Sequence, residues 1–145
     1  MLDVWRRLKR IGWRGLTLRL EALLLLRHIM RGLRRRPFSE VREDLVPAAT
    51  LIGPAAQHGD QERAAPVGMA VASAARFVPG ALCVSQALAT QVMLARRGEP
   101  SVIHFGFLRS GSGGVEGHAW LEVDGTVVIG DGALDDFTRT ATFET

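Results

Sequence analysis

The dipeptide Asp124-Gly125 is the feature that most restricts how this chain can fold. It separates two runs rich in apolar and β-branched residues, GHAWLEV (117–123) and TVVIGD (126–131). Asp-Gly between two such runs is among the strongest short signals for a two-residue β-hairpin turn. A further run of this kind, SVIHFGFL (101–108), predicts a third strand. The C-terminal part of the chain is therefore expected to contain an antiparallel sheet.

The hairpin turn also predicts which side chains face each other. With a two-residue turn, Val123 faces Thr126, and the same register places His118 directly across from Asp131. Directly opposed side chains lie on one face of the sheet with Cβ atoms about 5 Å apart. A carboxylate in that position can hold an imidazole N–H and fix the tautomer that a general base needs. We therefore predict His118 as a base oriented by Asp131, and interpret Asp124 as a turn residue.

The single cysteine of the chain, Cys83, lies at the start of a predicted helix over residues 82–97. Few β-branched residues occur in this segment, and Gly98 followed by Pro100 is typical of a helix C-terminus. The dipole and the free N–H groups of a helix N-terminus favour a thiolate, and the backbone N–H can donate to an oxyanion. A buried, inert cysteine is the alternative, but the predicted histidine–carboxylate pair favours a nucleophile.

The N-terminal part of the chain differs from the rest in charge. Residues 1–36 hold 11 basic and 2 acidic residues, a net charge of +9, whereas residues 37–145 carry a net charge of −6. The spacing of the leucines predicts one or two helices before Pro37, with Thr17 as a cap and Gly12, Gly15 and Gly32 as points of interruption. Such a basic segment either contacts a negatively charged partner or is a solvated helix surface.

The middle of the chain gives weaker signals. We predict a short helix over 39–46 capped by Ser39, a loop over 47–66 that is rich in proline and glycine, and a small-residue helix over 67–77. The tail ALDDFTRTATFET (133–145) adds little to the interpretation.

Composition excludes several classes of protein. A lone cysteine allows no internal disulfide and predicts a reducing, cytoplasmic setting. The most apolar stretch, residues 16–30, is interrupted by charged side chains, so no transmembrane segment is expected. No phosphate-binding glycine motif and no metal-ligand spacing is present, so we expect neither cofactor nor metal. His104 lies within a predicted strand without an evident carboxylate partner.

Two segments carry a resemblance to a known family. CVSQALATQVMLARRGEPSVIHFGF followed by GHAWLEVDGTVVIGD resembles the leader peptidase of lasso peptide biosynthesis, the stand-alone protease half of the split lasso maturase. The resemblance covers residues 79–131 and places the chain among transglutaminase-like cysteine proteases. It implies an α+β fold, with a helical N-terminal region (1–75) followed by a papain/transglutaminase-like catalytic core (76–145). In that core a Cys-bearing helix packs on an antiparallel sheet, and the whole chain forms one compact unit.

The same resemblance implies an activity and partners. The family's catalytic triad corresponds to Cys83, His118 and Asp131 of this sequence. The enzyme would cut the leader from a lasso precursor peptide and deliver the core peptide to a macrolactam-forming lasso cyclase. A separate leader-recognition protein is expected as a further partner, and no cofactor is implied. No nucleic acid is expected as a partner, and association with a membrane is left open.

Two alternatives remain open at this stage. In one, the triad belongs to a transglutaminase-like amidase or acyltransferase with another substrate, since a fold does not fix the substrate. In the other, the chain is a non-enzymatic basic helical adaptor that binds nucleic acid or a membrane. The basic segment contains no known nucleic-acid motif and few aromatic residues, which counts against the adaptor.

Overall fold

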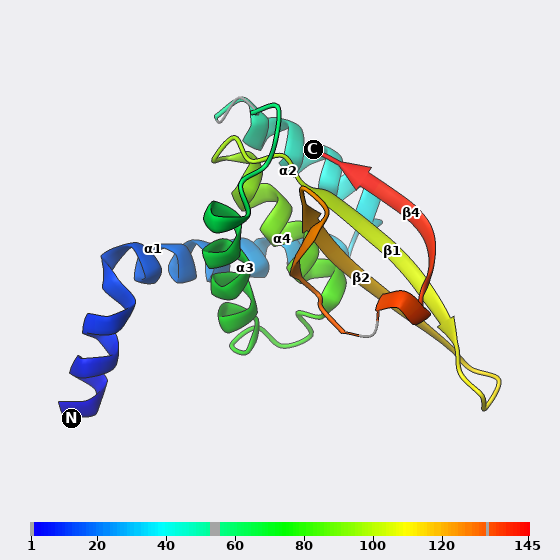
Figure 1. Cartoon of the computed structure of the whole chain (residues 1–145), viewed down its shortest axis with the longest axis horizontal. Helices are drawn as coiled ribbons and strands as arrows, with labels where there is room; N and C mark the ends of the chain where they lie inside the picture. The colour runs from blue at the N-terminus through cyan, green and yellow to red at the C-terminus, as the bar shows by residue number, and fades with distance from the viewer. Residues whose placement is uncertain (1, 53–55, 133) are drawn as a thin grey trace.

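The computed structural model describes residues 2–52, 56–132 and 134–145 of the chain, and the side chains from Gly12 onward. In this part of the chain, four α-helices and a four-stranded antiparallel sheet form an α+β fold (Figure 1). The helices gather on one face of the sheet, and the first part of helix α1 projects away from the rest (Figure 1). None of the described helices combines the length and the apolarity that a membrane crossing requires.

Helix α1 (Leu2–Leu33) is bent at Gly12, whose φ of 63° and ψ of 160° are not helical. The predicted interruption is confirmed at Gly12, because glycine adopts positive φ without steric cost, whereas Gly15 and Gly32 lie inside the helix without breaking it. The prediction that Thr17 caps a helix is wrong. Thr17 lies inside α1, and its hydroxyl donates to the Arg14 carbonyl at 2.9 Å. The helix ends four residues before Pro37, as expected.

Helices α2 (Phe38–Thr50) and α3 (Gln61–Ala75) are both longer than predicted. Pro47 and Pro66, the two ends of the predicted loop, lie inside these helices, and Ser39 is not the cap of α2. Buried side chains occur on both sides of each proline. Packing of these side chains into the core outweighs the loss of one backbone hydrogen bond, so tertiary contacts override the local signal.

Helix α4 (Cys83–Ala95) agrees with the predicted helix to within two residues at each end. Gly98 has a φ of 72°, as its predicted place after the helix requires. The Arg97 guanidinium donates to the Met93 carbonyl at 2.8 Å and so satisfies an acceptor of the last turn.

The sheet has the strand order β3-β2-β1-β4, and all neighbours are antiparallel. Its strands are β1 (Val102–Arg109), β2 (Val115–Val123), β3 (Thr126–Ile129) and β4 (Thr138–Glu144). The three strands predicted from the sequence are thus confirmed, and none of their ends is shifted by more than two residues. A single turn of 3-10 helix, η1 (Leu134–Asp136), connects β3 to β4.

Strand β4 was not predicted. Its side chains are mostly exposed, so it lacks the apolar alternation that identifies a strand in a sequence. Long-range hydrogen bonds hold it in place instead. The buried Gln91 amide on α4 donates to the Phe143 carbonyl at 2.9 Å, and the Thr145 N–H donates to the Ser101 carbonyl at 3.1 Å.

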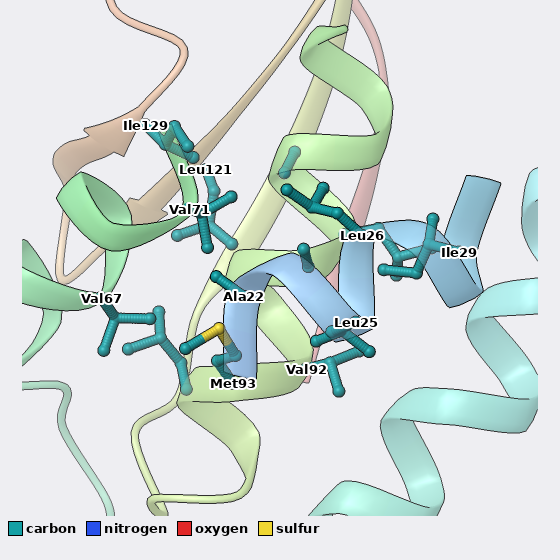
Figure 2. Packing of buried hydrophobic residues seen from close by; sticks show 14 of the residues in the cluster. Ala22, Leu25, Leu26, Ile29, Val67, Val71, Val92, Met93, Leu121 and Ile129 are labelled. Atoms are coloured by element: carbon teal, nitrogen blue, oxygen red, sulfur yellow. The ribbon is translucent and has the colours of Figure 1, made fainter. Parts of the chain in front are cut away.

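A single hydrophobic cluster joins the helices to one face of the sheet (Figure 2). Helix α4 lies at its centre and is buried along its length from Ala87 to Ala95, including the polar side chains of Thr90 and Gln91. Helix α1 contributes side chains at helical spacing, and α3 and the sheet close the cluster: Ala22, Leu25, Leu26, Ile29, Val67, Val71, Ile103, Leu121 and Ile129.

Candidate active site

Cys83 is the first residue of α4, as predicted. The preceding residue, Leu82, has an extended backbone, and no side chain caps the helix N-terminus. The N–H groups of the first turn therefore have no side-chain acceptor and can stabilise a negative charge at this point. The Cys83 side chain is half-buried and packs against the hydrophobic cluster, while Leu82 beside it is 71% exposed. The thiol thus lies at the boundary between the core and the solvent.

His118 lies on β2, and its ring is held by three contacts. The Nε2 atom is 2.8 Å from the Gly130 carbonyl oxygen. The ring packs against Phe137, with centroids 5.4 Å apart, and stacks on Trp120 at 6.2 Å and an interplanar angle of 22°. A carbonyl oxygen only accepts hydrogen bonds, so Nε2 carries the proton and donates it. In the neutral ring, this leaves the Nδ1 lone pair free to act as a base.

Asp131 does not face His118 as the hairpin register predicted. The pairs Val123–Thr126 and Glu122–Val127 are as predicted, but the next pair is Leu121–Ile129, and β3 ends there. Val128 is the extra residue of a β-bulge, which shifts the register by one.

The bulge coincides with a close approach of α3. A Cβ atom built on Gly68 of α3 would lie 2.5 Å from the Val128 carbonyl oxygen, so only glycine allows this contact. The predicted pairing is therefore wrong, and Asp131 is exposed beyond the strand end. The prediction that Asp131 is a catalytic residue stays a prediction.

The residue before Asp131 makes the contact instead. Gly130 has a φ of 83°, and a Cβ atom there would lie 2.6 Å from the Ala119 carbonyl oxygen and 2.9 Å from the Trp120 Cα. This close passage over β2 brings the Gly130 carbonyl to the His118 ring. A glycine at the end of a predicted strand is a known signal for a bulge or for close backbone contact, and it could have indicated this residue.

The two predicted catalytic side chains lie on different sides of the sheet. Ala119 and Leu121 belong to the cluster around α4, so the alternation of β2 places His118 on the opposite face. Because β3 pairs only as far as Leu121, no strand in the described part of the chain pairs with this edge of β2 at His118. Among the described residues, no hydrogen bond joins the Cys83 thiol to the His118 ring.

A hydrogen-bonded cluster lies next to His118 on the same face. Both carboxylate oxygens of Glu122 accept, one from the Trp120 indole N–H at 3.0 Å and the other from His104 Nε2 at 3.0 Å. Arg139 on β4 lies 3.3 Å from the same carboxylate, and its guanidinium stands over the Trp120 ring at 5.5 Å. Trp120 is therefore itself held by three contacts: the hydrogen bond to Glu122, the Arg139 guanidinium and the stack with His118.

This cluster corrects the interpretation of His104 as a histidine without a carboxylate partner. The register of β1 and β2 pairs His104 with Trp120, so Glu122 lies diagonally across from it on the same face. The sequence did not reveal the pairing, because the connection from Ser110 to Gly114 does not fix the register of these strands. The second ring nitrogen of His104, Nδ1, is buried without a hydrogen-bond partner among the described residues.

The other end of α4 is tied to α1 by ion pairs. Glu21 accepts from Arg96 at 3.0 Å and from Arg97 at 2.6 Å. Burial acts to raise the pKa of Glu21, but the hydrogen bonds from Arg97 and Arg96 outweigh it and hold the pKa below its ordinary value of 4.5.

No three His, Cys, Asp or Glu side chains converge as a metal site in the part of the chain that the structure describes.

The fold and the position of the cysteine define a class of protein: a helix that begins at a half-buried cysteine packs on an antiparallel sheet that carries the histidine. A family model described as the transglutaminase-like superfamily matches residues 23–142, so the chain belongs to this superfamily. No match was found among curated proteins or among solved structures. The predicted fold class and the family level of the resemblance are confirmed, and the specificity of a lasso leader peptidase stays a prediction.

Proposed function

We propose that this chain is a cysteine peptidase that cleaves the leader from a lasso precursor peptide. The observation that carries the proposal is the fixed His118 ring, whose Nε2–H donates to the Gly130 carbonyl and whose Nδ1 is left as a base. The chain has one cysteine, and that cysteine begins the helix packed on the sheet of His118. Membership of a superfamily that includes cysteine peptidases supports the same reaction class.

The reaction follows from these groups. His118 takes the proton of the Cys83 thiol, and the thiolate attacks the scissile carbonyl carbon. The Cys83 N–H at the helix N-terminus donates to the oxyanion. The imidazolium then gives its proton to the leaving amine, and water hydrolyses the thioester to release the carboxylate and the free thiol. Hydrogen bonds between catalytic groups are often long in an unliganded enzyme and tighten when substrate binds.

The meeting of the thiol and the ring takes place, in this proposal, at the edge of β2 beside His118, where β3 no longer pairs. The proposal requires the Cys83 side chain to reach this edge from the helix-covered face and His118 to reach it from the other face. Asp131, which follows Gly130, is the proposed third member of the triad and acts by restraining this turn and stabilising the imidazolium.

The proposed substrate rests on the resemblance over residues 79–131. Cleavage at the end of the leader frees the amino group that a cyclase then uses to form the macrolactam. A separate recognition protein presents the leader, and the cytoplasm keeps the single thiol reduced.

The test is incubation of the full chain with a lasso precursor, its recognition protein and a primary amine, followed by mass spectrometry. Release of unmodified leader and core supports the peptidase, whereas a leader–amine adduct indicates a transglutaminase-like acyltransferase. Cys83→Ala is expected to abolish cleavage while the circular dichroism spectrum stays unchanged. Cleavage at an undiminished rate by Cys83→Ala would falsify the proposal.

A further inference from the structure

A basic groove lies between α1 and the loop that leads to Cys83. Arg27, Arg31 and Arg34 form one wall of this hollow of about 230 Å³, and Phe77 and Pro79 form the other wall. The side chains of Met30 and Val78 complete the lining.

The three arginines are available to a ligand. All three are exposed, and none of them forms an ion pair with any residue whose side chain the structure describes. Arg36, a few residues later, is in contrast paired with Asp44 at 2.5 Å. The opposite wall is apolar, and the Phe77 side chain is 71% exposed. A large exposed apolar side chain facing free guanidinium groups is typical of a binding surface.

The spacing of the arginines matches an extended peptide. Arg27 and Arg31 are one helical turn apart, or about 6 Å along the axis. Side chains on one face of an extended peptide repeat every 6.7 Å or so. Acidic side chains at alternate positions of such a peptide can therefore reach successive arginines, while the intervening side chains turn toward Phe77 and Pro79.

The groove is in contact with the loop that positions the nucleophile. Gly80 has a φ of 79°, and a Cβ atom there would lie 3.3 Å from the Met30 Cε atom of the groove lining. Three residues after Gly80 the chain reaches Cys83, and the exposed Leu82 stands between them.

We propose that this groove binds an acidic segment of the peptide substrate, in extended form and with apolar side chains at alternate positions. The inference rests on the proposed function, since it assigns a docking surface to the substrate of the same Cys83 site. A peptide is favoured over other anionic partners because the surface is a narrow hollow with one apolar wall. A nucleic-acid duplex or a bilayer surface would need a broader basic face.

The experiment measures binding separately from chemistry. The full chain carrying Cys83→Ala is titrated into a fluorescein-labelled peptide that contains the segment Leu-Glu-Leu-Glu-Leu-Glu, and anisotropy is recorded at low and at physiological salt. The test variant adds Arg27→Glu, Arg31→Glu and Arg34→Glu. The matched control adds Arg14→Glu, Arg35→Glu and Arg109→Glu, which change the net charge equally at exposed positions outside the groove.

We expect the groove variant to bind the peptide at least about tenfold more weakly than the parent, and the control to stay within about twofold. A peptide with lysine in place of glutamate should not bind, and Phe77→Ala should weaken binding of the glutamate peptide. Equal binding by the groove variant and the control, or absence of binding by the parent, overturns the inference.

Three further measurements address other occupants and the chemistry. Two outcomes overturn the assignment to a peptide. In one, single-stranded DNA or phosphatidylserine vesicles bind more tightly than the glutamate peptide, and the groove variant loses that binding. In the other, the parent self-associates in sedimentation and the groove variant does not. Alkylation of wild-type Cys83 by iodoacetamide, compared with His118→Ala, tests the proposed catalytic pair independently. Peptide binding without a His118-dependent thiol would leave the groove standing and remove the peptidase.

Discussion

The two faces of the sheet are built in different ways. The face toward α4 carries apolar side chains such as Ala119 and Leu121, which are at most 1% exposed and make no side-chain hydrogen bonds. The opposite face carries Trp120 and Glu122, which are held in place by directed hydrogen bonds and ring contacts beside His118. The first face depends on burial and tolerates small adjustments, whereas the second depends on the position of individual atoms. Changes on the face toward α4 should therefore affect mainly stability, whereas changes on the opposite face should affect mainly activity.

The largest effect is expected on activity from His118→Ala. Loss of a general base should lower kcat/KM by about a thousandfold, while the urea midpoint changes little because the ring is only half-buried. Steady-state cleavage of the precursor and urea unfolding measure the two properties. His58→Ala removes an exposed histidine and serves as the control. A loss of less than tenfold in His118→Ala would show that the base is elsewhere.

On the face toward α4, Leu121→Ala should reduce stability instead. This side chain is fully buried, so its truncation is expected to lower the free energy of unfolding by about 3 kcal/mol. Urea unfolding followed by circular dichroism gives the value. Val115→Ala, at a position 69% exposed on the same strand, should change stability by less than about 0.5 kcal/mol. Similar values for the two variants would contradict the assignment of this face to the core.

Gly130→Ala should affect both properties, because its backbone crosses β2 to reach His118. A methyl group there would clash with the Ala119 carbonyl and occupy an unfavourable φ, so we expect a loss of about 2 kcal/mol in stability. Displacement of the carbonyl from the His118 ring should also lower kcat by about tenfold. Gly117→Ala, where a Cβ atom meets nothing within 4 Å, is the control for both measurements.

Comparison of Gly130→Ala with Asp131→Asn shows which group orients the His118 ring, the Gly130 carbonyl or the Asp131 carboxylate. If the Gly130 carbonyl orients the ring, Gly130→Ala is the more damaging change in kcat. A larger loss in Asp131→Asn would assign the orientation to the carboxylate, and the pH profile of kcat/KM would shift with it.

Glu122→Gln should have a smaller effect on the hydrogen-bonded face. The amide can still accept from Trp120, but the charge that attracts His104 and Arg139 is lost. We expect a decrease of about 1 kcal/mol in stability and about threefold in kcat. Glu116→Gln, on an exposed position of the same strand, is expected to change neither property. An unchanged Glu122→Gln variant would mean that the cluster does not position His118.

The smallest effect concerns the helices, where Glu21 joins α1 to α4. Its pKa is lower in the folded chain than its ordinary value of 4.5, so the ionised carboxylate stabilises the fold above that value. This contribution is lost as the pH falls below 4.5 and through the lower folded pKa. Urea midpoints at about pH 6 and about pH 3.5 should therefore differ more for the wild type than for Glu21→Gln. Equal differences would show that the ion pairs do not contribute.

Features that local residue preferences determine could be predicted from the sequence, whereas features that long-range contacts determine could not. The hairpin turn, its first two residue pairs and the helix that begins at Cys83 follow from local residue preferences, and all are confirmed. The bulge at Val128 coincides with the approach of Gly68 from a helix some 60 residues earlier, and no local pattern contains that contact.

Two other parts of the fold escaped prediction for a similar reason. Strand β4 has no apolar alternation and is fixed by partners such as Gln91 on α4. Pro47 and Pro66 signal loops locally, but the helices around them are maintained by burial. In the candidate site, the residue types and positions of Cys83 and His118 could be predicted. The Gly130 contact was signalled only by a glycine at the end of a predicted strand, because the contact itself arises from the shifted register.

Strand β4 has a consequence for the site although it contributes no catalytic side chain. The stretch from Gly130 to Phe137, which supplies two of the contacts to His118, is anchored by β3 at one end and by β4 at the other. A segment pinned at both ends has far fewer accessible conformations than a free tail. Deletion of residues 138–145 would turn this stretch into such a tail, and two of the three contacts that hold the imidazole would loosen without any change in the residues that touch it.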